Sequence, residues 1–309
     1  MLKKIVFMGT PIFSVPILKS LYQNGFPISV VYTQPPQKSH RGQKINKSPI
    51  QKMSETLNIE CRTPLNLKNN KEEFDYLKKL NADISIVVAY GNIIPEEMLN
   101  LTKKGFVNIH ASLLPKWRGA APIQRSIMNL DKETGISIMK IKKNLDSGPV
   151  CNSYKIDITE NDNFETLSNK LSILAAEKIS DIVQEILDDK LKFEDQNHEQ
   201  ASYAGKIEKS EGKIDWNKPA ESIIGKINGL YPDPGAWFIY NGERYKILKA
   251  KVGDRTEIPG IVLDNYLEIS CSDKSIKILE IQRQGRKSQN INEFVLGSQI
   301  KKGSNLNNV

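Results

Sequence analysis

The hydrophobic pattern near the N-terminus alternates between strand-like and helix-like spacing. Residues 5–8 are consecutively apolar and end at Gly9, which predicts a short buried strand. Apolar residues at positions 15, 18, 21 and 22 then follow helical spacing, and the segment 28–33 predicts a second strand. A strand, a helix and a strand in this order form a βαβ unit, so we expect a parallel sheet with helices on its faces.

The same alternation continues up to residue 187. Buried strands are predicted at residues 84–89, 106–110 and 135–141. Helices are predicted at residues 50–57 and 74–80, from Pro122 onward, and at 164–187. Residues 34–48, between the second strand and the first of these helices, are predicted to form a loop. This part of the chain therefore indicates an α/β domain.

The composition changes after residue 187. Residues 188–203 are polar and acidic, and we interpret them as a linker between a first domain, 1–187, and a second domain, 204–309. The second domain begins with one predicted helix, at 220–228. Short strands are predicted after it, at residues 237–240, 245–248, 260–263, 267–270 and 276–279. Several short strands separated by turns favour a small, closed or nearly closed barrel.

The composition excludes several classes of protein. The chain has 309 residues, of which 39% are hydrophobic and 26% charged, as in ordinary globular proteins rather than disordered chains, collagens or disulfide scaffolds. No apolar run approaches the roughly 18 residues of a membrane-spanning helix, and the first apolar run is too short for a signal peptide. The three cysteines are far apart, which argues against a metal cluster and a disulfide framework. We therefore expect a cytoplasmic protein with no metal.

Positive charge is concentrated in the N-terminal part of the chain. The net charge is +8, from 44 basic and 36 acidic residues, and the first acidic residue is Glu55. Residues 1–54 hold eight basic residues, so the rest of the chain is balanced at 36 against 36. The densest stretch is 38–47, which is flanked by prolines. Such a stretch is either a solvated loop or a surface that binds phosphates, and charge alone leaves both open.

The turn after the first strand lacks a dinucleotide-binding signature. Residues 9–14 read GTPIFS, without the G-x-G-x-x-G pattern, and no acidic residue follows about 20 positions later. A nicotinamide cofactor is therefore not expected. Gly9 still permits a ligand to approach closely at the carboxyl end of the strand, where open α/β sheets bind ligands.

Three polar residues near predicted strand ends suggest chemistry. Asn108 and His110 are two positions apart on one strand, so they share a face of the sheet, and Asp146 follows the strand at 135–141. Taken singly, the first two fit a hydrogen-bonded structural pair and the third fits an ordinary turn. Together, an amide donor, an imidazole and a carboxylate can stabilise an oxyanion and move a proton. The sequence shows no activated nucleophile such as the serine of G-x-S-x-G, so this set suits direct acyl-type transfer through a tetrahedral intermediate.

These residues lie in a recognisable pattern. The segments NIH at 108–110, SLLP at 112–115, RG at 118–119 and DSG at 146–148 together resemble the signature of the folate-dependent formyltransferases. Further segments resemble the branch of that family that formylates methionyl-tRNA: GTP at 9–11, TQP at 33–35, RGQK at 41–44, AYG at 89–91, RGAAPIQR at 118–125, IDW at 214–216 and PDPGAW at 232–237. The resemblance covers almost the whole chain.

The resemblance implies a Rossmann-like first domain and an OB-like barrel as the second. It implies that Asn108 and protonated His110 stabilise the oxyanion of the tetrahedral intermediate, while Asp146 holds His110 and helps to move the proton. The implied formyl donor is 10-formyltetrahydrofolate, with no metal. The implied folate-binding residues are Ser112, Leu113, Leu114 and Pro115, together with Tyr90 and Gly91.

The resemblance also offers a reason for the charge distribution. The basic loop matches a family insertion that enters the acceptor stem of tRNA, and the implied contacts are Lys38, Arg41, Lys44 and Lys47. Implied phosphate contacts in the second domain are Arg283, Arg286 and Lys287, although an ordinary surface turn explains these three as well. We expect a monomer whose partners are folate and initiator methionyl-tRNA, with no membrane contact.

Two alternatives stay open. A formyltransferase for a small amine, such as a ribonucleotide or an amino-sugar nucleotide, would need neither the basic loop nor the barrel. A non-catalytic RNA-binding protein on an inherited α/β scaffold would not need the intact set of Asn108, His110 and Asp146. Formyl transfer measured on charged tRNA, on small amines and on water discriminates between these functions.

Overall fold

The computed structural model describes residues 3–39 and 44–307. By packing, the chain forms two compact units. The first unit comprises the residues up to 119 together with 135–156 and 168–203, and the second comprises 120–134, 157–167 and the residues from 204 onward. Two segments that precede residue 188 therefore pack with the second unit. The linear division into 1–187, 188–203 and 204–309 stays a prediction.

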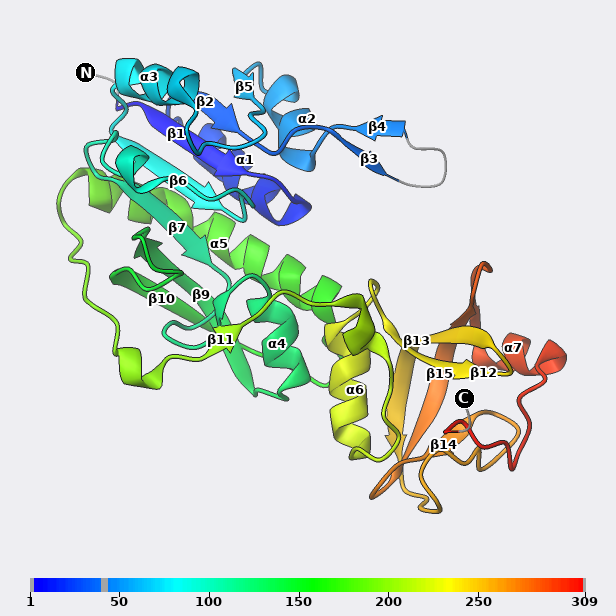
Figure 1. Cartoon of the computed structure of the whole chain (residues 1–309). Helices are drawn as coiled ribbons and strands as arrows, with labels where there is room; N and C mark the ends of the chain where they lie inside the picture. Colours follow the sequence, from blue (N-terminus) through cyan, green and yellow to red (C-terminus); the bar gives the residue numbers. More distant parts are fainter. Residues whose placement is uncertain (1–2, 40–43, 308–309) are drawn as a thin grey trace. The chain divides into compact units, whose positions relative to one another are not determined.

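A seven-stranded sheet forms the centre of the first unit (Figure 1). Its strand order is β10-β9-β7-β6-β1-β2-β5. The strands are β1 (Ile5–Gly9), β2 (Ile28–Tyr32), β5 (Cys61–Arg62), β6 (Ile84–Val88), β7 (Phe106–His110), β9 (Glu133–Lys140) and β10 (Val150–Asp157). Neighbouring strands from β5 to β7 run parallel, and β9 pairs with β7 antiparallel. The structure confirms the predicted Rossmann-like parallel sheet.

Helices cover both faces of this sheet. The helices are α1 (Val15–Gln23), α2 (Pro49–Thr56), α3 (Lys71–Leu80) and α5 (Phe164–Leu187), with short 3₁₀ turns η1 (Ile12–Ser14), η2 (Glu96–Met98) and η3 (His198–Gln200). Val6 and Met8 of β1 share one face and belong to the same buried cluster as Leu77 of α3. The Ser20 hydroxyl of α1 donates a hydrogen bond to the Ala176 carbonyl of α5 at 2.6 Å. Because both faces are covered, β1 is completely buried, as its apolar run predicts.

The strand order reverses at β1. From β1 the chain proceeds to β2 and β5 on one side, and then returns to β6 and β7 on the other side. Open α/β sheets bind ligands at such a reversal, outside the carboxyl ends of the strands. His110 is the last residue of β7, and so it lies at this end of the sheet.

The segment predicted as a loop at 34–48 contains a hairpin. β3 (Gln37–Ser39) pairs antiparallel with β4 (Lys44–Asn46), and the hairpin extends away from the sheet (Figure 1). The prediction of an irregular loop is wrong, because it relied on buried apolar positions and this hairpin exposes its apolar residue: Ile45 is 69% exposed. Arg41 lies outside the described residues.

An antiparallel sheet forms the second unit, in agreement with the prediction. The strand order is β12-β13-β15-β14, and β16 also pairs with β15. The strands are β12 (Ala236–Tyr240), β13 (Glu243–Gly253), β14 (Glu268–Ser270), β15 (Ser275–Arg283) and β16 (Ser288–Asn290). The helices are α4 (Pro122–Met128), α6 (Ala220–Gly229) and α7 (Ile291–Gly297), with the 3₁₀ turn η4 (Lys209–Gly212). Closure of this sheet into an OB-like barrel stays a prediction.

The strand predicted at 260–263 does not form. Ile261 and Val262 make only isolated bridges to neighbouring segments. Gly260 has a φ of 84°, which lies outside the β region, so the chain turns where the strand was expected to begin. The prediction is wrong because it used the apolar residues of a short segment. Those residues do not indicate that Gly260, at the start of the segment, adopts a left-handed conformation.

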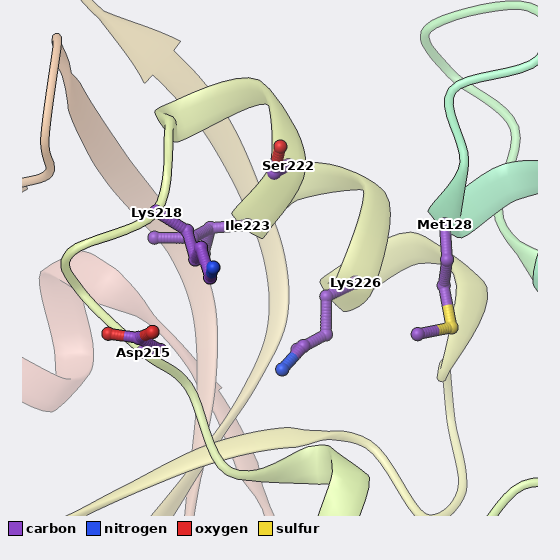
Figure 2. A pocket seen from close by; sticks show the side chains of 6 residues that line it. All are labelled: Met128, Asp215, Lys218, Ser222, Ile223 and Lys226. Carbon is purple, nitrogen blue, oxygen red and sulfur yellow. The ribbon is translucent and has the colours of Figure 1, made fainter.

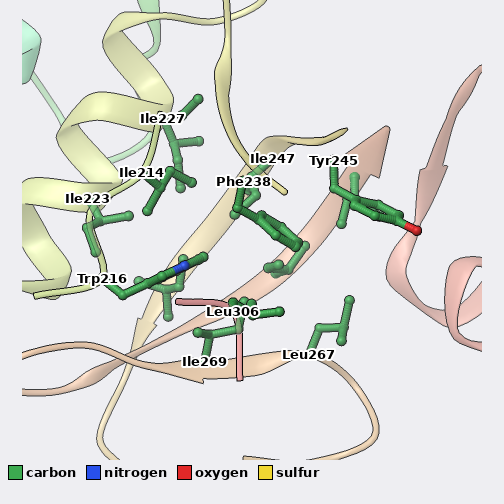
Figure 3. Packing of buried hydrophobic residues seen from close by; sticks show 14 of the residues in the cluster. Ile214, Trp216, Ile223, Ile227, Phe238, Tyr245, Ile247, Leu267, Ile269 and Leu306 are labelled. Carbon is green, nitrogen blue, oxygen red and sulfur yellow. The ribbon is translucent and has the colours of Figure 1, made fainter. Parts of the chain in front are cut away.

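Aromatic rings run through the core of the second unit (Figure 3). Trp216 meets Phe238 edge-on, with ring centroids 5.7 Å apart, and Phe238 stacks on Tyr245 at 5.5 Å. Tyr245 in turn meets Phe294 of α7 edge-on at 5.9 Å. Isoleucines and leucines from α6 and the strands surround these rings. The second unit therefore has a hydrophobic core of its own.

Helices α4 and α6 approach closely at a glycine. A Cβ at Gly229 would lie 2.6 Å from Met128 Cγ and 2.9 Å from the carbonyl oxygen of Gln124. Because a helix backbone cannot yield easily, we expect Gly229→Ala to lower the free energy of unfolding by about 1–3 kcal/mol. Thermal denaturation measures this, with Gly297→Ala as the control, since a Cβ there meets nothing within 4 Å. Equal melting temperatures for the two variants would contradict the packing.

Candidate active site

β7 carries Asn108 and His110 on one face at the carboxyl end of the sheet. The strand pairs with β6 along one edge and with β9 along the other, so backbone hydrogen bonds fix it on both sides. His110 is 6% exposed, whereas Asn108 is half-buried and stays partly accessible. The shared face predicted from their spacing follows directly from this strand.

The imidazole of His110 has a defined orientation. Its Nε2 lies 2.8 Å from the carbonyl oxygen of Trp117, and its Nδ1 lies 3.6 Å from Oδ2 of Asp146. A carbonyl oxygen can only accept, so Nε2 carries a proton and donates it to Trp117. A second proton, bound at Nδ1, would make the ring an imidazolium that faces a carboxylate. The ring of His110 therefore turns one nitrogen toward the Trp117 carbonyl and the other toward the Asp146 carboxylate.

The loop after β7 also binds the Asp146 oxygen that faces His110. Its Oδ2 accepts a hydrogen bond from the backbone N–H of Gly119 at 2.8 Å. Its backbone is in the left-handed region, with φ of 44°, which Asp tolerates better than most residues. The carboxylate thus lies between the Gly119 amide and the His110 ring. Of the three residues predicted to be catalytic, the structure therefore places His110 and Asp146 next to each other.

Serine hydroxyls fasten the loop that follows β7. The buried Ser112 hydroxyl donates to the Lys116 carbonyl at 2.6 Å. The Ser137 hydroxyl of β9 donates to the Ser112 carbonyl at 2.8 Å and accepts from the Leu114 N–H at 3.0 Å. Leu113, Leu114 and Pro115 are half-buried. Ser112 is therefore engaged within the loop, and the half-buried residues are the ones that present a surface.

The two other predicted folate-binding residues follow β6. Tyr90 is 2% exposed and packs in the core of the first unit, and burial raises its pKa to about 12. Its carbonyl accepts a hydrogen bond from the Thr10 hydroxyl at 2.7 Å, which joins the segments after β1 and β6. Gly91 has φ of 87° and leaves no space for a Cβ beside Gln34. The folate-binding roles of these residues stay predictions.

Comparison with known proteins decides the family. The chain matches the family model for formyl transferase over residues 3–183 and the model for the formyl transferase C-terminal domain over residues 206–299. This chain belongs to the formyl transferase family. The predicted formyltransferase activity is thereby confirmed.

Individual members of the formyl transferase family resemble the chain over its full length. It is 69% identical to a methionyl-tRNA formyltransferase of Pelagibacter ubique, over 100% of both chains. It is 42% identical to a methionyl-tRNA formyltransferase of Caldanaerobacter subterraneus subsp. tengcongensis, over 98% of this chain and 99% of the relative. Among solved structures, the sugar 3N-formyl transferase WlaRD, crystallised with dTDP and 5-N-formyl-THF, superposes with a TM-score of 0.70 at 22% identity. That alignment covers 93% of this chain and 100% of WlaRD, and it supports the fold.

A segment that was predicted only as part of the linker lies against both loops of this candidate site. We call residues 194–202 the strap. Glu194 and Val150 exchange backbone hydrogen bonds of 2.9 and 2.8 Å beside the Asp146 loop. The carbonyl oxygen of Ser202 accepts a hydrogen bond from the Arg118 N–H at 2.8 Å. The Ser202 hydroxyl accepts another from the Trp117 N–H at 2.9 Å. The strap therefore connects the loop that follows β7 with the loop that carries Asp146.

The basic residues of the hairpin are only partly described. Lys38 and Lys44 lie on β3 and β4, and Lys47 follows β4. The Lys47 ammonium lies 2.8 Å from the Glu55 carboxylate, and half of its side chain is exposed. The charge of Lys47 is therefore matched within the protein, and the tRNA contacts predicted for this hairpin stay predictions.

The three basic residues predicted to contact phosphates in the second unit lie at the end of β15 and in the turn before β16. Arg283 is at the end of β15 and its guanidinium lies 2.6 Å from the Glu243 carboxylate. Arg286 and Lys287 are exposed in the turn that follows. Because Arg283 already has an acidic partner, Arg286 and Lys287 are the stronger candidates for contacts with phosphates.

A small cavity of about 230 Å³ lies beside α6 in the second unit (Figure 2). It is lined by Met128, Asp215, Lys218, Ser222, Ile223 and Lys226. The Lys226 ammonium donates to the Lys213 carbonyl at 3.0 Å, and burial lowers the pKa of Lys226. Two ammonium groups and one carboxylate give the cavity a small positive charge. None of the predicted catalytic residues lines it.

The helices of the described ranges include none that is both long enough and apolar enough to cross a membrane.

Proposed function

We propose that this chain transfers the formyl group of 10-formyltetrahydrofolate to the α-amino group of initiator methionyl-tRNA, with Asn108, His110 and Asp146 as the catalytic residues. The observation that carries the catalytic assignment is the apposition of His110 Nδ1 and Asp146 Oδ2 at 3.6 Å at the carboxyl end of β7. The choice of acceptor rests on 69% identity, over the full chain, with a protein named methionyl-tRNA formyltransferase.

The reaction forms one C–N bond and breaks another. The unprotonated α-amine attacks the formyl carbon, which places negative charge on the formyl oxygen and positive charge on the amine nitrogen. The amide of Asn108 stabilises the oxyanion by donating a hydrogen bond, and the positive charge of protonated His110 stabilises it electrostatically. Collapse of the intermediate breaks the bond between the formyl carbon and the folate nitrogen, and leaves N-formylmethionyl-tRNA and tetrahydrofolate.

One proton must move from the amine nitrogen to the folate nitrogen. Asp146 uses Oδ2 for Gly119 and His110, so its second oxygen is the group that accepts this proton and passes it on. The negative charge of Asp146 also stabilises the imidazolium of His110. The two residues therefore act as a unit, and their removal is expected to be non-additive.

The folate is proposed to bind against the half-buried residues 113–115 and near Gly91. Residues 113–115 lie in the loop whose shape Ser112 and Ser137 fix, and Gly91 follows β6, next to β7 in the sheet. A bound folate would therefore approach the formyl-accepting site from the carboxyl ends of β6 and β7. Formyl transfer with 10-formyltetrahydrofolate and charged tRNA, followed for the wild type and for His110→Ala, tests the assignment.

The turn between β15 and β16 is proposed to contact tRNA phosphates. We expect Arg286→Ala combined with Lys287→Ala to raise KM for methionyl-tRNA, with kcat and the KM for folate unchanged. Each lost phosphate contact also makes the negative slope of log(kcat/KM) against log[salt] shallower by about one. Steady-state kinetics across a salt series measure both effects.

The control for this pair is Lys71→Ala, an exposed lysine of α3 that pairs with Asp75. It removes the same kind of charge from another surface and is expected to leave the salt slope unchanged. An unchanged KM for tRNA in the Arg286 and Lys287 variant would assign these residues to an ordinary surface turn.

A further inference from the structure

Gln196 of the strap is a buried polar residue whose whole amide is engaged. It is 9% exposed. Its Oε1 accepts hydrogen bonds from the Arg118 guanidinium, at 3.1 Å from Nε and 2.7 Å from Nη2. Its Nε2 donates to two carbonyl oxygens, of Asp146 at 2.9 Å and of Gly148 at 2.7 Å. One side chain thus bridges a buried arginine and the backbone of the loop that holds Asp146.

The orientation of the Gln196 amide is fixed by the chemistry of its neighbours. A guanidinium only donates, so the amide oxygen must face Arg118, and both amide hydrogens must then face the two carbonyls. Arg118 is 3% exposed, and its Nη2 also donates to Nδ1 of His198 at 2.9 Å. Arg118 is therefore held on two sides by strap residues, and it presents Gln196 in a single orientation.

The hydrogen bonds of Gln196 constrain the backbone of Asp146, the residue whose carboxylate faces His110. Asp146 is in the left-handed region, which is accessible to Asp but is not its preferred conformation. The hydrogen bonds to the carbonyls of Asp146 and Gly148 fix the backbone on both sides of Ser147. With that backbone fixed, the Asp146 carboxylate stays between the Gly119 amide and the His110 ring.

We infer that Gln196 is a positioning residue for formyl transfer, which holds Asp146 opposite His110 through the backbone of the 146–148 loop. This inference rests on the proposed catalytic role of Asp146. Loss of the two donated hydrogen bonds frees the loop, and small displacements of a reacting group carry large costs in rate. We expect Gln196→Met to lower kcat about 10–100-fold, with the KM values for folate and tRNA changed less than about 2-fold.

A second variant separates positioning from folding. Gln196→Glu keeps an acceptor for Arg118, but it replaces the two amide hydrogens by an oxygen that faces two carbonyl oxygens. We expect it to fold with a melting temperature close to that of the wild type and to lose kcat to a similar extent. The matched controls are Gln200→Met and Gln200→Glu, since Gln200 is exposed on the same strap; both are expected to retain wild-type kcat.

A double-mutant cycle with Asp146→Asn is the decisive experiment. If Gln196 acts by placing the charge of Asp146, then Gln196→Glu has no further effect on kcat once that charge is absent. Full additivity of the two variants, or wild-type kcat in folded Gln196→Glu, overturns the positioning role and leaves the proposed function intact. Wild-type kcat in Asp146→Asn itself overturns the proposed catalytic assignment instead.

Discussion

Asp146→Asn is expected to lower kcat for formyl transfer about 10²–10³-fold, with little change in the KM for either substrate. An asparagine oxygen can still accept from the Gly119 N–H, so the shape of the loop is kept. The amide carries no negative charge opposite His110 and cannot accept the proton released by the amine. The loss therefore falls on the tetrahedral intermediate rather than on substrate binding.

Asn108→Ala and His110→Ala are expected to reduce kcat by similar factors, and the combined variants by much less than the product of the single effects. Single-turnover measurements with saturating folate and charged tRNA isolate the chemical step. Asp75→Asn, on the exposed surface of α3, is the control for removing a carboxylate charge. Near-normal turnover in any of the three variants would remove that residue from the mechanism.

Gly148→Ala is expected to abolish most of the activity through steric displacement of the Asp146 loop. A Cβ at Gly148 would collide with the carbonyl oxygen of Lys140 and would lie 3.1 Å from Lys142 Cγ. Lys140 is part of β9, whose backbone is paired in the sheet, so the loop has to move instead. We expect kcat/KM to fall by a factor of about 10² or more, because the carboxylate of Asp146 moves away from His110.

The control for Gly148→Ala is Gly205→Ala, where a Cβ meets no atom within 4 Å. Kinetics and thermal denaturation of both variants distinguish loss of chemistry from loss of folding. A Gly148→Ala protein with wild-type kcat/KM would show that the close approach to Lys140 does not set the position of the catalytic loop.

The placement of the proposed catalytic residues was partly predictable because its signals are local. Asn108 and His110 follow from the period of one buried strand, and their place at its carboxyl end follows from the direction of a parallel sheet. The functional interpretation depended on the motif around Asp146, since an isolated Asp-Ser-Gly segment is typical of many turns. The distance between His110 and Asp146 required the structure.

Three features of the structure were not predictable from the sequence: β10, the strap, and the packing of α4 with the second unit. β10 is an edge strand whose residues are all half-buried or exposed, so it has no buried apolar run. The strap is held by backbone hydrogen bonds and by the side chains of Gln196, His198 and Ser202, and such contacts leave no periodic pattern in a polar segment. The packing of α4 with the second unit depends on the glycines of α6, which by composition alone would only weaken a helix.

The most direct test of the account compares acceptors for the same formyl donor. Purified protein is incubated with 10-formyltetrahydrofolate and either charged initiator tRNA, uncharged tRNA, glycinamide ribonucleotide, an amino-sugar nucleotide or buffer alone, and kcat/KM is measured for each. We expect N-formylmethionyl-tRNA as the main product, no formylation of uncharged tRNA, and loss of the product in His110→Ala. A higher kcat/KM for a small amine, or release of formate to water at a rate comparable with transfer, would contradict the proposed function.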